Sequence, residues 1–215
     1  VGCCTGRRPT TRTRRERCCA PPCAVTSRSN SMAASDRHPQ RLTPLPADEW
    51  DEDTRAALAS LIPAERANPV GAGNVLSTLV RHPDLTAAYL PFNAYLLTRS
   101  TLSPRIREVA LLRVVHRSKC GYLWSHHLPI ARRAGLSESD IDDIRRGRCA
   151  DPTDAAVVRA VDELTGDSTL SRQTWDRLCE LFTQRQCMDL IFTIGGYLLL
   201  ALAVNTFGVQ EEETP

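Results

Sequence analysis

The stretch from Leu190 to Val204 constrains the fold most, because its 15 residues carry no charge and are apolar apart from Thr193. A helix of this length rises about 22 Å. That falls short of the ~20 residues that a helix needs to cross a bilayer. We therefore expect a helix over residues 184–205 that is buried on all sides in a protein core, and no membrane association.

Sequence signals for helix starts recur along the rest of the chain, from about residue 45. Ser103 followed by Pro104 supplies a cap oxygen and then proline at the first helical position. Ser137 with Asp140 has the spacing of a capping box. No strand pattern, phosphate loop or repeat is present, so we expect a single all-α domain. The expected helices cover residues 48–61, 74–80, a segment opening at 83, 104–118, 120–134, 137–147, 151–166, 171–182 and 184–205.

Residues 1–41 differ from the rest in composition. They hold nine arginines against two acidic residues, a net of +7, so the remainder carries −5 of the overall +2. With few large apolar side chains, this segment cannot offset the entropy of ordering, and we expect a disordered tail. The sequence changes character just after Met32, which favours Met32 as the native start. The folded domain then covers residues 42–215, and its mild acidity argues against nucleic-acid binding.

The nine cysteines show no paired Cys-x-x-Cys spacing, and their number is odd. A disulfide scaffold or a structural zinc site is therefore not indicated. The chain also lacks the apolar stretch of a secretory signal, so we expect a reduced, cytoplasmic protein. Cys149, Cys179 and Cys187 have no acid or base nearby in the sequence, and we interpret them as structural thiols.

The chemically informative segment joins Glu108, on one expected helix, to Cys120 and His127 on the next. At 100° per residue, Cys120, Trp124 and His127 fall on one narrow helical face. A buried thiol or carboxylate facing an imidazole is a common way to tune a general acid, a base or a nucleophile. The alternative is that Cys120 fills the core and His127 is a hydrogen-bonded core histidine.

The order of these residues resembles the carboxymuconolactone decarboxylase/alkylhydroperoxidase-D family, in which a helical Glu precedes a Cys-x-x-(Cys or Glu)-x-x-x-His helix. The resemblance extends from about residue 42 to residue 209. It implies an all-α fold of the alkylhydroperoxidase-D type and a homo-oligomer, either a trimer or a hexamer. It also implies catalytic roles for Glu108, Cys120 and His127, and substrate contacts from Tyr122, Trp124 and Tyr197.

One position departs from the family pattern, because Leu123 stands where a second cysteine or a glutamate is usual. Leucine can neither ionise nor attack. Three functions therefore stay open: a cofactor-free lyase or decarboxylase acting on a small carboxylated lactone-like compound, a thiol-dependent hydroperoxidase acting through Cys120, or a binding protein that kept only the fold. We expect no metal ligands, since His126 points about 100° away from His127 around the helix.

Overall fold

The computed structural model describes residues 38–212, which lie in one compact unit and whose regular structure is all helical, with no strand among them. The all-α prediction is therefore confirmed. The predicted tail over residues 1–41 lies outside the described residues, except for its last four, as does the proposed start at Met32.

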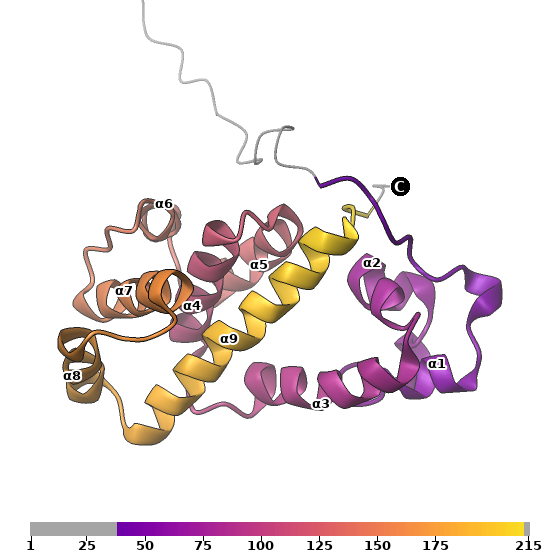
Figure 1. The fold of residues 1–215 in the computed structure, drawn as a ribbon, viewed down its shortest axis with the longest axis horizontal. Helices are drawn as coiled ribbons and strands as arrows, with labels where there is room; N and C mark the ends of the chain where they lie inside the picture. Colours follow the sequence, from indigo (N-terminus) through magenta and orange to yellow (C-terminus); the bar gives the residue numbers. More distant parts are fainter. Residues whose placement is uncertain (1–37, 213–215) are drawn as a thin grey trace, which may run out of the picture. The chain divides into compact units, whose positions relative to one another are not determined.

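Among the described residues, short 3-10 turns at Ala47–Glu49 and Ala64–Arg66 precede α1 and α2, and the later α-helices follow one another through brief connections (Figure 1). The α-helices are α1 Glu52–Ala56, α2 Pro69–Leu79, α3 Pro83–Thr98, α4 Pro104–Arg117, α5 Gly121–Arg133, α6 Glu138–Arg146, α7 Pro152–Asp167, α8 Arg172–Leu181 and α9 Gln184–Phe207.

The predicted helix starts of α4 and α6 are confirmed by their caps. Ser103 accepts a hydrogen bond from the backbone N–H of Ile106, and Ser137 forms a capping box with Asp140. Gly147 ends α6 in the left-handed conformation, with φ of 73°, which costs glycine little. Local hydrogen bonds thus set the ends of both helices.

Two predicted helices near the start of the domain differ from the structure. The helix predicted over residues 48–61 is wrong, because only α1 is α-helical and Asp51 caps it by accepting from the N–H of Thr54. The helix predicted from Asn74 begins earlier, at Pro69. Gly73 interrupts it with a φ of 69°, so Asn74 opens only its second part.

Helix α4 occupies the centre of the unit and packs against α5, α6, α7 and α9. Every residue from Glu108 to Val115 on it is buried. A smaller cluster, which includes Leu45, Trp50, Leu58 and Leu90, joins the first helices to α3. The core around α4 therefore fixes the helices that carry the predicted site.

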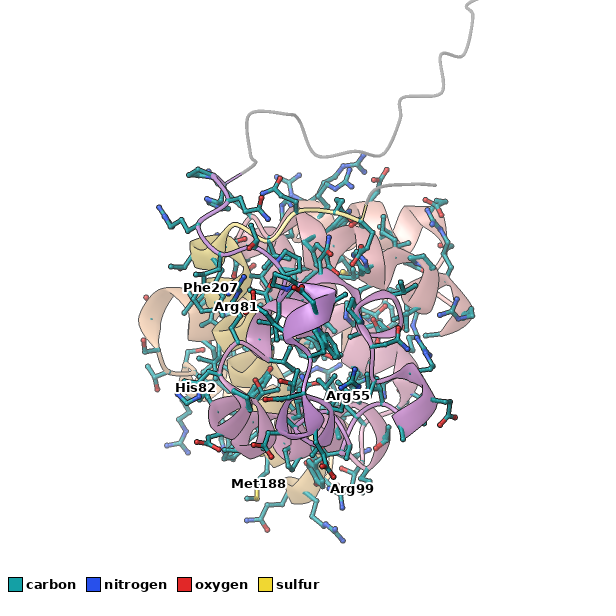
Figure 2. All side chains as sticks on the ribbon, turned by 90° about the vertical axis from the view of Figure 1, so that its right-hand side faces the viewer. Arg55, Arg81, His82, Arg99, Met188 and Phe207 are labelled. Carbon is teal, nitrogen blue, oxygen red and sulfur yellow. The ribbon has the colours of Figure 1, made fainter. Side chains whose placement is uncertain are left out.

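Helix α9 is only partly buried, so the expectation of burial on all sides is wrong. It is long and apolar enough to cross a membrane, yet 56% of its most apolar window is buried in this structure. Met188, Phe192, Leu199 and Leu202 are each more than half exposed. Figure 2 shows the Met188 side chain projecting from the surface. One apolar face of α9 is thus open to solvent or to another protein.

Asp189 anchors the first turns of α9 to the connection between α3 and α4. Its carboxylate accepts from the Tyr95 hydroxyl at 2.8 Å, from the Thr101 N–H at 2.6 Å and from the Thr101 hydroxyl at 2.7 Å. Further along α9, a Cβ atom on Gly196 would lie 2.7 Å from the Leu96 Cδ1 atom, so α3 packs directly against this glycine.

Candidate functional site

Glu108 and His127 meet between α4 and α5. The Glu108 Oε2 atom lies 3.0 Å from the His127 Nδ1 atom, and the two residues are 0% and 8% exposed. An ionised carboxylate can only accept a hydrogen bond, so the ring donates from Nδ1. The His127 Nε2 atom is left with its lone pair free when the ring is neutral, which is the arrangement of a carboxylate-oriented general base.

The second oxygen of the Glu108 carboxylate faces an arginine. Arg107 Nε lies 3.4 Å from Glu108 Oε1, while Arg107 Nη1 donates to the Leu97 carbonyl oxygen at 2.8 Å. A buried carboxylate is costly unless it is paired and hydrogen-bonded. Both conditions are met here, so the structure accommodates an ionised Glu108 beside His127.

Tyr197, on α9, contacts the Glu108–His127 pair through the His127 ring. Its ring meets the His127 ring edge-on, with centroids 5.5 Å apart and an interplanar angle of 86°. Burial, together with the nearby Glu108 charge, raises the pKa of Tyr197 well above its usual range. The hydroxyl therefore stays protonated at ordinary pH and can donate a hydrogen bond.

On α3, the partly buried Tyr89 and the buried Asn93 form a polar pair that the sequence did not single out. Asn93 Nδ2 donates to the Tyr89 hydroxyl at 3.2 Å, and burial raises the pKa of Tyr89 to about 12. Tyr89 lies close enough to Tyr197 that an ionised Tyr89 would raise the pKa of Tyr197 further. No local motif marks either residue, because α3 reaches the site only through packing.

Cys120 sits at the cap position of α5 and is fully buried. Burial raises the pKa of its thiol to about 11, although the Leu123 N–H donates to the sulfur and acts in the opposite direction. Within residues 38–212 no hydrogen bond joins this thiol to His127 or Glu108. Among the described residues, Cys120 thus has no hydrogen-bonded base that would activate its thiol.

The raised pKa predicts that Cys120 resists alkylation. The reactive thiolate becomes appreciable only as the pH approaches 11, and the side chain is shielded, whereas Cys179 is exposed. At neutral pH we expect iodoacetamide to modify Cys179 and to leave Cys120 unmodified, as measured by peptide mass spectrometry. Equal rates at the two cysteines would contradict the geometry.

Tyr122 and Trp124 make their contacts elsewhere. Tyr122 stacks on His126 with centroids 4.0 Å apart, and its hydroxyl donates to Glu212 at 2.6 Å. Trp124 is buried beside the His116 ring, and the Arg145 guanidinium lies 4.9 Å from the centre of its ring. Of the predicted residues, the structure brings together Glu108, His127 and Tyr197.

Two further arginines on α4, Arg105 and Arg113, form ion pairs. Arg105 contacts Asp154 at 2.6 Å, and Arg113 contacts Asp162 at 2.8 Å. A surface hollow of about 570 Å³ along α7 and α8 is lined by polar side chains that include Arg159. None of the predicted site residues lines this hollow.

A family model matches the part of the chain that carries these features. The model of the carboxymuconolactone decarboxylase family matches residues 83–165, a range that contains both Glu108 and His127. No curated protein sequence matches the chain.

Several solved structures share the fold. An alkylhydroperoxidase AhpD core protein from Ralstonia eutropha, described as peroxidase-related, is 19% identical, with 82% of this chain and 94% of that chain covered and a TM-score of 0.64. A protein of unknown function from Agrobacterium tumefaciens, proposed for AhpD-type antioxidant defence, is 19% identical, with 62% and 94% covered and a TM-score of 0.57. The debrominase Bmp8 in its apo form is 15% identical, with 80% and 91% covered and a TM-score of 0.58.

These likenesses establish the fold, and the family model adds the segment that carries the Glu108–His127 pair. Residues 83–165 are thus similar to the carboxymuconolactone decarboxylase family, and the fold resembles that of AhpD-like proteins.

Proposed function

We propose that the chain is a cofactor-free acid–base enzyme of the lyase type, which acts on a small carboxylated lactone-like compound. The observation that carries this proposal is the buried Glu108–His127 pair, with Nδ1 of the imidazole held by the carboxylate. The substrate class comes from the family resemblance. The catalytic residues in this proposal are His127 and Glu108.

The proposed reaction is a decarboxylation. The bond between the substrate's carboxylate carbon and the neighbouring carbon breaks, and carbon dioxide leaves. The electron pair of that bond moves into the adjacent conjugated carbonyl group of the substrate. His127, protonated from solvent, then transfers the proton on Nε2 to the resulting carbanion, and Glu108 stabilises the positive imidazolium until that step. The Tyr197 hydroxyl stays protonated because its pKa is raised, so it is available to donate a hydrogen bond to the developing oxyanion.

A thiol hydroperoxidase acting through Cys120 fits the structure less well. Such an enzyme needs an accessible thiolate with a lowered pKa. Burial instead raises the pKa of Cys120 to about 11, and Leu123 offers no second thiol. Hydroperoxidase activity and ligand binding without turnover are the two other outcomes that a functional test must distinguish.

The test is an assay of carbon dioxide release from a panel of carboxylated lactones, beside hydroperoxide consumption with a dithiol. We expect His127→Gln to lower decarboxylation about 10²–10⁴-fold, the usual contribution of general acid–base catalysis. Cys120→Ala should keep the wild-type rate. Hydroperoxide turnover that disappears in Cys120→Ala would contradict this proposal and identify a thiol peroxidase. Tight binding of a lactone without turnover would contradict it and identify a binding protein.

We also propose that a second copy of the chain covers the exposed face of α9. Met188, Phe192, Gly195, Leu199 and Leu202 follow one another at alternating spacings of four and three residues, the repeat of a helix–helix seam. Apolar residues at this spacing pack when another helix lies along them. A homo-oligomer built in this way would remove the apolar strip from water.

The seam predicts a self-associating protein. We expect light scattering to give a mass of at least two copies for the wild type, and Leu199→Glu to shift the protein towards the monomer because it places a charge in the seam. The control is Val70→Glu, at a side chain that is 94% exposed and lies off α9. A monomeric wild type, or equal masses for both variants, would refute the proposed seam.

A further inference from the structure

The chain end described by the structure folds back over the exposed side of α5. There His126 meets Glu211 and Glu212, and one possible ligand atom from each residue lies within 4.8 Å of the other two. These residues are separate from the Glu108–His127 pair and have no role in the proposed reaction. About 85 residues of sequence lie between the histidine and the two glutamates, so no local motif predicts this cluster.

The imidazole of His126 is oriented by the backbone of its own helix. Its Nδ1 atom lies 2.8 Å from the Tyr122 carbonyl oxygen. A carbonyl can only accept, so Nδ1 carries the hydrogen and a neutral ring has its lone pair on Nε2. A histidine that ligates a metal typically donates its other ring N–H to a backbone carbonyl or a carboxylate, as this one does.

One oxygen of each carboxylate accepts hydrogen bonds from neighbouring groups of the protein. Glu212 Oε1 accepts from the Tyr122 hydroxyl at 2.6 Å and from the Asn74 N–H at 2.8 Å. Glu211 Oε1 accepts from the Ser125 hydroxyl. One oxygen of each carboxylate is therefore committed, while the other oxygen is turned toward the His126 ring.

The remaining atoms face one another as acceptors. His126 Nε2 lies 2.9 Å from Glu212 Oε2, and two acceptors at that distance need a proton or a cation between them. With metal–nitrogen and metal–oxygen bonds of about 2.0–2.2 Å, two ligand atoms at roughly 90–110° lie about 2.9–3.5 Å apart. Glu211 Oε2 is 3.5 Å from His126 Nδ1. Metal binding therefore requires the exposed Glu211 side chain to turn from the Nδ1 side of the ring toward the Nε2 side.

We propose that His126, Glu211 and Glu212 bind a divalent transition-metal ion of the zinc type, with water completing the coordination. One imidazole and two carboxylates suit zinc or cobalt better than magnesium, which prefers oxygen ligands and retains several waters. The bound ion would tie the segment around Glu212 to α5 and, through Asn74, to α2. This reverses the sequence-based expectation that His126 has no partners for a metal.

The test is a Co²⁺ titration of the tag-free full-length chain, monitored by absorption. Nitrogen and oxygen ligands give weak visible bands, whereas binding by cysteines adds intense near-ultraviolet bands, so the two kinds of site are told apart. We expect one equivalent of the nitrogen–oxygen type, and binding at least about tenfold weaker in His126→Gln and in Glu212→Gln. His38→Gln, an exposed histidine outside the cluster, is the matched control and should bind as the wild type does.

All three side chains are exposed, so the variants should fold, and circular dichroism checks this. The proposal is overturned if the wild type shows only cysteine-type binding. It is equally overturned if His126→Gln and Glu212→Gln bind Co²⁺ as tightly as His38→Gln does. The contacts of His126 with Glu211 and Glu212 would then be ion pairs without a metal.

Discussion

Replacing Asp189 with alanine should destabilise the protein by about 3 kcal/mol, because the change leaves three hydrogen-bond donors without their acceptor. The donors are the Tyr95 hydroxyl and the N–H and hydroxyl of Thr101. Asp189 is 7% exposed, so water replaces the lost acceptor only in part. Denaturant unfolding monitored by circular dichroism measures the loss.

The same carboxylate predicts how stability depends on pH. Burial acts to raise the pKa of Asp189, but the hydrogen bonds from Thr101 and Tyr95 outweigh it, and the pKa is lowered. Because the pKa of Asp189 is lower in the folded state than in the unfolded state, its ionised form stabilises the fold. This stabilisation is fully present above the unfolded-state pKa of about 3.9, and it is lost as the pH falls through the folded-state pKa. The advantage of wild type over Asp189→Asn should therefore be constant above about pH 5 and shrink below about pH 4.

Asp142 is the matched control, since it lies on α6 with its side chain 48% exposed. We expect Asp142→Ala to change stability by less than about 0.5 kcal/mol. Equal losses for Asp142→Ala and Asp189→Ala would show that the connection between α3 and α4 does not depend on the Asp189 hydrogen bonds.

Glu108→Gln should lower turnover of the carboxylated lactone by about 10²–10⁴-fold while the protein stays folded. The amide has the shape of the carboxylate but no charge, so it no longer stabilises an imidazolium at His127. Its nitrogen also donates rather than accepts, and an amide nitrogen turned toward Nδ1 favours the opposite tautomer of the ring. The rate constant at saturating substrate is the quantity to compare.

The matched control is Glu138→Gln, because Glu138 is an exposed glutamate that pairs with Arg132. Its turnover should equal that of the wild type. Unchanged turnover in Glu108→Gln would mean that the carboxylate serves the core and has no part in the chemistry.

The sequence predicted most of the helices because their ends are fixed locally. Ser103 and Ser137 supply cap hydrogen bonds within three residues of themselves. The failure over residues 48–61 has a non-local cause, since the chain turns after α1 to bury Leu58 in a cluster with Trp50 and Leu90. No pattern within that segment records the position of α3.

The candidate site was predictable where it depends on neighbouring helices. Glu108 and His127 lie on consecutive helices that pack together, and both are buried. Tyr122 comes five residues before His127, about 140° away around the helix, and so reaches a different surface. Its partner Glu212, like the pair of Tyr89 and Asn93, comes from a distant part of the chain, which only the fold brings close.

The tautomer of His127 tests the proposed acid–base pair most directly. Long-range proton–nitrogen correlation spectra of the neutral ring, assigned by comparison with His127→Gln, report which ring nitrogen carries hydrogen. We predict hydrogen on Nδ1 and a bare Nε2 in the wild type, with a clear change in Glu108→Gln. Hydrogen on Nε2 in the wild type, or identical spectra for wild type and Glu108→Gln, would contradict the proposal that Glu108 prepares His127 for proton transfer.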